Sequence, residues 1–255
     1  MKSGLVSITF RQLSPSQIVD LCLKADVSAI EWGGDIHVPH GEVDIAREVG
    51  QMTRDAGLEI ASYGSYYKSV DSENGDLPFS KVLETAVALG APRIRVWAGG
   101  KGSADASPEY RSSIVENLRT IAAAAAEHGV VVDLEYHANT LTDDNASAVS
   151  LMREVNHPNL RSLWQPSFAF SYEEQVQALV DIAPWLDYLH VYTWIEENGN
   201  CVRHPLAKGE LQWKVFFEEA AKHVPPYALI EFVADDRPEQ FLEDAKALNH
   251  WLNSL

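Results

Sequence analysis

The sequence predicts a single α/β domain folded as a (β/α)8 barrel. Apolar runs typical of buried strands alternate with amphipathic, helix-like segments along all 255 residues, with no long linker between them. Their spacing of roughly thirty residues is the size of one βα unit. Eight strands alternating with helices favour a closed barrel over a doubly wound sheet, which usually has fewer strands. The predicted strands begin near Leu5, Ser28, Leu58, Arg93, Val130, Leu160, Leu186 and Tyr227.

Recognisable start and stop residues delimit the helix-like segments. A Ser or Asp at the N-cap satisfies backbone donors of the first turn, and Pro suits the first helical positions. Such starts lie at Ser14, Ser107, Ser171 and Asp236. Glycine supplies the left-handed residue that commonly follows a helix. The predicted stops, each just before a new strand, are Gly57, Gly90 and Gly129.

The charge balance argues against polyanionic partners. Lys and Arg number 20 against 37 acidic residues, which gives a formal charge of −17. A surface this acidic repels nucleic-acid phosphates and anionic lipid, so we expect neither nucleic acid nor a membrane as partner. The same charge would also be useful for solubility alone.

The cysteines and the N-terminus predict a cytoplasmic protein. Cys22 and Cys201 lie far apart and outside any Cys-x-x-Cys pattern, as expected for free thiols in a reducing compartment. The apolar stretch at the N-terminus is interrupted by Arg11 and is too short for a secretory signal. No apolar run reaches the ~20 residues needed to span a bilayer.

Four residues, each at the end of an apolar run, predict a metal site. They are Glu135, Gln165, His190 and Glu231. The carboxyl ends of parallel barrel strands meet at one face, where active sites are built. Two carboxylates, an imidazole and an amide oxygen are suitable ligands for one divalent cation. In the alternative interpretation each Glu forms a structural ion pair and His190 is a satisfied core residue.

Strand parity predicts a second, structural group of charges inside the barrel. Arg95 lies two positions before Trp97 on one strand, so the two side chains point to the same side of the sheet. Asp133 and Glu135 have the same relation on the next strand. Neighbouring strands would then place Arg95 beside Asp133, with Glu31 nearby.

Polar and aromatic residues near the strand ends are candidates for substrate binding. Aromatic rings there could stack on the apolar face of a sugar, although packing is the commoner role for any one of them. His and Arg side chains on the loops could contact substrate oxygens or simply be solvated. The candidates are His37, Tyr66, Trp97, His137, Trp194 and Arg203.

On these motifs the chain resembles the xylose isomerase-like TIM barrel superfamily, which includes sugar isomerases and epimerases, sugar dehydratases and the AP-endonuclease family. The resemblance covers nearly the whole chain. It rests on residues 29–34, 37–40, 61–64, 135–137, 190, 204–206, 209–210 and 230–231.

The resemblance also implies roles for the four strand-end residues. In ketose epimerases of this superfamily, one divalent ion is held by Glu, Asp, His and Glu, and the two Glu exchange protons with the substrate carbon. These roles map onto Glu135, Gln165, His190 and Glu231. The chain departs from the pattern Asp-x-x-His, because Gln165 replaces the Asp and Phe168 replaces the His. That departure counts against the His-rich trinuclear zinc site of the endonucleases.

The expected activity is that of a metal-dependent sugar isomerase or epimerase. The cation would bind the carbonyl and an adjacent hydroxyl of a ketose, keto-sugar or sugar acid and stabilise an enediolate. Glu135 and Glu231 would be the catalytic residues, one removing a proton and the other returning it. Mixed oxygen and nitrogen ligation favours Mn²⁺, with Mg²⁺, Co²⁺ and Zn²⁺ as alternatives.

Two other functions fit the same residues. An enediolate can expel a β-leaving group, which would make the protein a sugar dehydratase or lyase. A non-catalytic sugar-binding barrel stays open because of Gln165. Barrels often bind a substrate phosphate at the loop after the last strand. Here that loop, residues 233–237, holds two acidic residues and one basic residue, so we expect an unphosphorylated substrate. A homodimer is the default assembly for a soluble enzyme.

Overall fold

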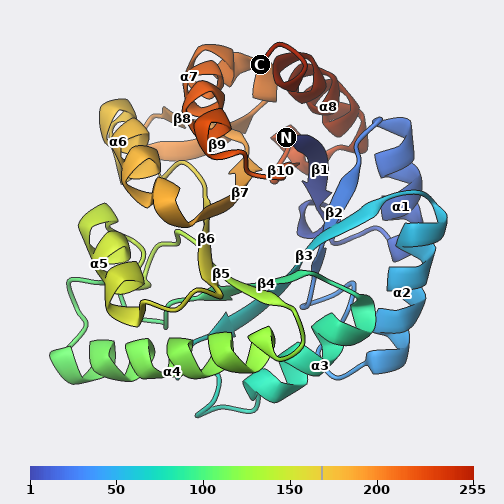
Figure 1. Ribbon diagram of the computed structural model, residues 1–255. Helices are drawn as coiled ribbons and strands as arrows, with labels where there is room; N and C mark the ends of the chain where they lie inside the picture. Colours follow the sequence, from blue (N-terminus) through green and yellow to red (C-terminus); the bar gives the residue numbers. More distant parts are fainter. Residues whose placement is uncertain (168) are drawn as a thin grey trace.

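The computed structural model describes residues 1–167 and 169–255 and confirms the predicted barrel (Figure 1). Within these residues, eight parallel strands close into one sheet in the order β1-β10-β7-β6-β5-β4-β3-β2. The first and last of them pair directly, with Lys2 opposite Tyr227 and Leu5 opposite Ile230. The strands are β1 (Lys2–Val6), β2 (Ala29–Gly33), β3 (Glu59–Lys68), β4 (Arg93–Trp97), β5 (Val131–Leu134), β6 (Leu160–Trp164), β7 (Leu186–Val191) and β10 (Tyr227–Ile230).

Helices surround the strands (Figure 1). They are α1 (Pro15–Lys24), α2 (Val43–Asp55), α3 (Phe79–Leu89), α4 (Pro108–Ala126), α5 (Asn145–Val155), α6 (Tyr172–Ile182), α7 (Glu210–Ala220) and α8 (Pro238–Leu252). Short 3-10 turns are η1 (Ser7–Phe10), η2 (Ala183–Trp185), η3 (Leu206–Gly209), η4 (Ala221–His223) and η5 (Ala234–Asp236). None of the described helices is both long and apolar enough to cross a membrane.

The helix starts confirm three of the four predicted caps. Ser14 and Ser171 form complete capping boxes, and the Ser107 side chain accepts a hydrogen bond from the backbone of the third helical residue. The predicted cap at Asp236 is wrong. Asp236 belongs to η5 with a φ of 50°, and Arg237 is the N-cap of α8 without a side-chain cap bond. The loop after β10 therefore turns through left-handed backbone before the last helix begins.

The predicted helix stops are also in place. Gly90 is the C-cap of α3 with a φ of 81°, and Gly57 and Gly129 likewise have positive φ after α2 and α4. One element was not predicted: β7 leads into an antiparallel hairpin, β8 (Thr193–Glu197) and β9 (Asn200–His204), which forms its own two-stranded sheet.

Two apolar clusters fill the fold. The larger one joins the outer faces of the strands to the helices and includes Trp32, Ile94 and Leu118. The smaller one includes Leu229 of β10, whose register partner is His190. Register partners in a parallel sheet point to the same face, so Leu229, like His190, points to the inside of the barrel.

Arg95 is fully buried inside the barrel and pairs with two glutamates. Its Nε lies 2.7 Å from Glu31 Oε1, and its Nη1 contacts Glu135 Oε2. Gly64 on the neighbouring strand leaves the room for this contact, because a Cβ there would lie 2.7 Å from Arg95 Nη2 and 2.8 Å from Glu31 Oε1.

The predicted pairing of Arg95 with Asp133 is therefore wrong. Arg95 and Asp133 are register partners on neighbouring strands. The long Arg95 side chain nevertheless extends past Asp133 and pairs with Glu31 and Glu135. Neither oxygen of Asp133 has a hydrogen-bond partner among the described residues. Burial, with the nearby Asp187 charge, raises the pKa of Asp133 well above its usual value and so favours the neutral form of this carboxyl.

Removal of Arg95 is expected to destabilise the fold strongly. Arg95→Ala should lower the free energy of unfolding by about 3–5 kcal/mol, because it leaves buried carboxylates without their cation. Urea denaturation monitored by circular dichroism measures this. Arg47→Ala, which breaks the exposed pair with Asp44, is the control and should change stability by less than about 1 kcal/mol. A loss at Arg95 no larger than that of the control would contradict the central role of this ion pair.

Candidate metal and substrate site

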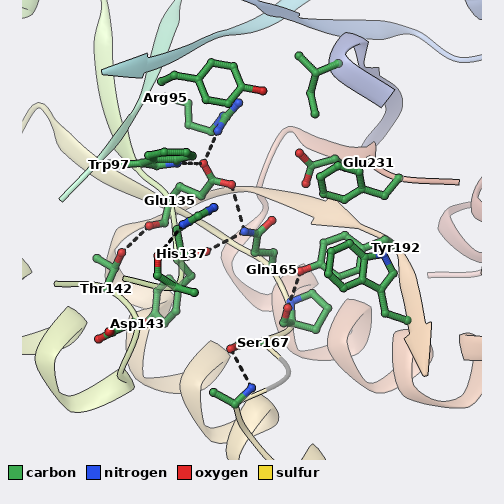
Figure 2. Close-up of a pocket in the computed structure, with 18 of the residues that line it drawn as sticks. Arg95, Trp97, Glu135, His137, Thr142, Asp143, Gln165, Ser167, Tyr192 and Glu231 are labelled. Atoms are coloured by element: carbon green, nitrogen blue, oxygen red, sulfur yellow. Dashed lines mark hydrogen bonds and ion pairs between the residues drawn. The ribbon is translucent and has the colours of Figure 1, made fainter. Parts of the chain in front are cut away.

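A cavity of about 360 Å³ opens at the carboxyl ends of the strands. Figure 2 shows its labelled lining residues, with Glu135 and Glu231 on opposite sides and Gln165 between them. Glu135 follows β5, Gln165 follows β6, and Glu231 follows β10. The barrel therefore brings these side chains together from separate strands, as expected for this face.

Glu135, His190 and Glu231 form a group that could hold a metal ion. One ligand atom from each lies within 4.8 Å of the others. All three are buried: their relative exposures are 3%, 0% and 3%. Two carboxylates and one imidazole are a common donor set for divalent transition metals.

Gln165 joins this group as its fourth member. Its Oε1 lies 3.2 Å from His190 Nδ1, while its Nε2 donates to Glu135 Oε1 at 3.1 Å and to the Tyr136 carbonyl at 2.7 Å. The two donor bonds fix the amide so that its oxygen faces His190. The structure thus brings together all four residues that the sequence predicted as ligands.

Glu31 orients His190 from below. His190 Nε2 lies 3.2 Å from Glu31 Oε2, which also accepts a hydrogen bond from the Tyr188 hydroxyl at 2.8 Å. Metal-binding histidines usually donate their second ring N–H to such a carboxylate, which fixes the ring. This contact leaves Nδ1 toward the cavity, 3.2 Å from Glu231 Oε2.

These contacts shift the pKa values of His190 and Glu31. Burial lowers the pKa of His190, but the charges of Glu231 and Glu31 outweigh it and raise that pKa to about 10. Burial likewise raises the pKa of Glu31, whereas Arg95 and His190 lower it to about 2. Without a metal, this raised pKa favours the imidazolium form of His190, whose ring lies between the carboxyl groups of Glu31 and Glu231.

The two catalytic candidates differ in their hydrogen bonding. Glu135 Oε2 accepts from Arg95 and Trp97, and its Oε1 accepts from Gln165. Glu231 Oε2 is buried and accepts no hydrogen bond from the described residues, with only the ion-pair contact to His190. A buried carboxylate oxygen without a donor needs a cation or a proton. The residues present therefore fit a divalent ion.

Aromatic side chains wall the cavity on two sides. Trp97 stacks on His137 with ring centroids 4.2 Å apart, and Tyr66 meets the same indole edge-on at 5.5 Å. Tyr192 and Trp194 pair at 4.9 Å on the other wall. The space between two such walls suits a flat, partly apolar ring.

Of the six predicted substrate-binding residues, four line the cavity. These are Tyr66, Trp97, His137 and Trp194. The described lining does not include His37, which is buried with Nδ1 2.9 Å from Ser7 Oγ and Nε2 3.1 Å from the Leu13 carbonyl. Nor does it include Arg203, whose guanidinium pairs with Asp236. Phe168, which replaces the His of the family pattern, lies outside the described residues.

Sequence reasoning missed two basic groups of the cavity wall. Arg11 donates to the Tyr66 hydroxyl at 2.8 Å and pairs with Asp35 at 2.9 Å. Arg95 also lines the cavity, where its Nη2 is buried without a hydrogen-bond partner among the described residues. The signal for Arg11 is its position shortly after the end of the first strand.

Comparison with known proteins agrees with this architecture. The chain is 30% identical over 278 residues to a 3-dehydroshikimate dehydratase of Bacillus anthracis, covering 98% of this chain and 97% of that protein. A crystal structure of a probable 3-DHS dehydratase of petrobactin synthesis from Bacillus anthracis superposes with a TM-score of 0.81 at 26% identity, covering 98% and 99% of the two chains.

A third relative contains a metal. A xylose isomerase-like TIM barrel protein from Mycobacterium smegmatis, solved in complex with magnesium, matches with a TM-score of 0.74 at 15% identity, covering 96% and 91% of the two chains. At that identity the match shows the fold alone. The family model described as xylose isomerase-like TIM barrel matches residues 19–254. With its closed barrel and this extent of match, the chain belongs to the xylose isomerase-like TIM barrel family.

Proposed function

We propose that the protein is a divalent-metal-dependent dehydratase that acts on a cyclic hydroxy-keto acid such as 3-dehydroshikimate. The observation that carries the proposal is the convergence of Glu135, His190 and Glu231, where Glu231 Oε2 contacts His190 but accepts no hydrogen bond from the described residues. The choice of dehydration over other proton-transfer reactions is supported by the 30%-identical dehydratase that matches nearly end to end.

Glu231 is the proposed base. Its Oε2 accepts no hydrogen bond from described residues, so it can take a proton from the carbon next to the substrate carbonyl. Glu135 suits this role less well, because Arg95 and His190 outweigh its burial and lower its pKa. The C–O bond at the next carbon then breaks, and the hydroxyl leaves as water with the proton that Glu231 took from the carbon.

The remaining groups bind and orient the ring. His137 uses Nδ1 to contact the Ala138 carbonyl at 2.8 Å, which leaves its other ring nitrogen for a substrate hydroxyl. The unpartnered Nη2 of Arg95 offers a donor to a carbonyl or carboxylate oxygen. The aromatic walls formed by Trp97 and Trp194 would hold a flat six-membered ring between them.

The proposed ligands of the metal are Glu135, Gln165, His190 and Glu231, through His190 Nδ1 and one oxygen of each other residue. Mn²⁺ is favoured because oxygen and nitrogen donors are mixed. When bound, the ion would supply positive charge next to the substrate carbonyl and make the neighbouring C–H more acidic.

Epimerisation is the second candidate. Glu135 and Glu231 lie on opposite sides of the cavity (Figure 2), which is the arrangement that a two-base proton exchange needs. The products distinguish the two reactions: an epimerase incorporates solvent deuterium into a ketose without losing water, whereas a dehydratase forms a product lighter by one water.

Replacement of Glu231 should abolish turnover. With 3-dehydroshikimate and Mn²⁺, Glu231→Gln should lower kcat at least about 100-fold, because an amide cannot accept the proton. Mass spectrometry of the dehydrated product measures this, and the exposed Glu116→Gln is the control. Wild-type turnover in Glu231→Gln would exclude this residue as the base. Deuterium uptake into ketoses by the wild type, with no dehydrated product, would favour the epimerase.

Metal binding should release a proton. His190 has a raised pKa of about 10 in the metal-free protein, and its Nδ1 must lose a proton to become a ligand. The affinity for Mn²⁺ should therefore rise with pH, by up to about tenfold per pH unit, until the pH reaches that pKa. Isothermal titration at pH 7 in two buffers of different ionisation enthalpy should show about one proton released. The exposed His223→Gln should behave as the wild type, and binding without proton release would contradict ligation by His190.

The charge of residue 165 should control metal affinity. Gln165→Glu keeps the side-chain size and adds a negative ligand, so the Kd for Mn²⁺ should fall about tenfold or more. The same change places two carboxylates in contact in the metal-free protein, so stability in the presence of a chelator should decrease. Competition with a fluorescent chelator measures the first effect. Equal affinities in Gln165→Glu, Gln165→Ala and the wild type would show that residue 165 is not a ligand.

A further inference from the structure

The segment that follows Glu231 has an unusual backbone. Phe232, Asp235 and Asp236 have φ values of 59°, 59° and 50°, although none of them is glycine. A left-handed conformation is least favourable for a bulky residue such as Phe232, and it persists only where surrounding contacts hold it. Phe232 is bonded directly to Glu231, whose own N–H donates to the Val191 carbonyl of β7 at 3.1 Å, so the backbone conformation of Phe232 constrains Glu231 from the loop side.

Contacts from two sides hold this segment. The Phe232 N–H donates to Thr9 Oγ1 at 3.1 Å from the η1 side. From the other side, the Arg203 guanidinium of β9 lies 4.5 Å from the centre of the Phe232 ring and also pairs with Asp236. Arg203 thus contacts both ends of the left-handed segment. Trp194 of β8 completes the contact, with its ring centroid 5.3 Å from that of Phe232.

The hairpin that carries Arg203 packs against η3, the turn that follows it. Thr193 Oγ1 donates to the Leu206 carbonyl at 3.1 Å, and the backbone at Gly209 packs so closely that a Cβ there would lie 2.4 Å from Thr193 Oγ1. The same hairpin continues directly from β7, which carries His190. Arg203 therefore connects the strand of one proposed ligand to the loop of another.

We propose that Arg203 is a positioning residue for the metal site. It holds the segment 232–236, with left-handed backbone at Phe232, Asp235 and Asp236, and so keeps Glu231 Oε2 at its 3.2 Å distance from His190 Nδ1. An exposed ion pair alone would contribute little, but a planar guanidinium can stack on Phe232 and pair with Asp236 at once. A lysine cannot make both contacts. The inference rests on the proposed role of Glu231 as a ligand and base.

Two measurements on Arg203→Met and Arg203→Lys test this. Hydrogen exchange of the metal-free protein reports on the segment directly, and its amides should exchange about tenfold faster in Arg203→Met. The Kd for Mn²⁺ should rise about tenfold in the same variant, with Arg203→Lys between it and the wild type. The control is Arg47→Met, which removes the exposed ion pair with Asp44 on α2 and should leave both quantities unchanged.

The outcomes separate this inference from the proposed function. Unchanged exchange in Arg203→Met would overturn the inference, and so would faster exchange with an unchanged Kd, because the loop would then not position Glu231. A wild-type protein that fails to bind Mn²⁺ would instead refute the proposed function, and the effect of Arg203 on the loop would be decided by exchange alone. A general loss of folding is recognised by exchange that accelerates throughout the barrel.

Discussion

The buried guanidinium of Arg95 is the constraint on which the centre of this barrel depends. Two fully or almost fully buried glutamates contact it, and neither could stay ionised in the barrel without a cation nearby. Because Arg95 lowers the pKa of Glu31, that carboxylate stays charged and binds His190 Nε2. The ring is then oriented so that Nδ1 faces the cavity. A chain of ionic contacts thus connects the interior of the barrel to the proposed metal ligand.

The same arrangement gives the two catalytic candidates different properties. Glu135 is surrounded by donors from Arg95, Trp97 and Gln165, so its negative charge is stabilised and its position is fixed. Glu231 comes from the far side of the barrel, where its Oε2 has no donor among the described residues. One carboxylate is thereby suited to hold charge and the other to accept a proton. The distinction follows from hydrogen bonding, since both residues are buried to the same extent.

The sequence predicted the strands and the four strand-end residues because both follow from short-range patterns. Apolar runs give the strands, and the position of Glu135 or Glu231 just after such a run gives the face of the barrel. Parity indicates which side of the sheet a residue faces but not how far its side chain extends, so the partner of Arg95 was predicted incorrectly. Arg203 depends on a hairpin and His37 on a loop, whose conformations no periodic pattern determines.

The amide at position 165 has a consequence for the substrate. In the proposed metal-loaded site, the three negative charges of Glu31, Glu135 and Glu231 are balanced by Arg95 and a divalent ion, with His190 neutral. A carboxylate at position 165 would make that group negative, whereas Gln165 keeps it neutral. A neutral site does not repel an anionic substrate, which matters in a protein with a formal charge of −17. Under the proposed function, the amide therefore avoids a repulsion that an anionic keto acid would experience and an uncharged ketose would not.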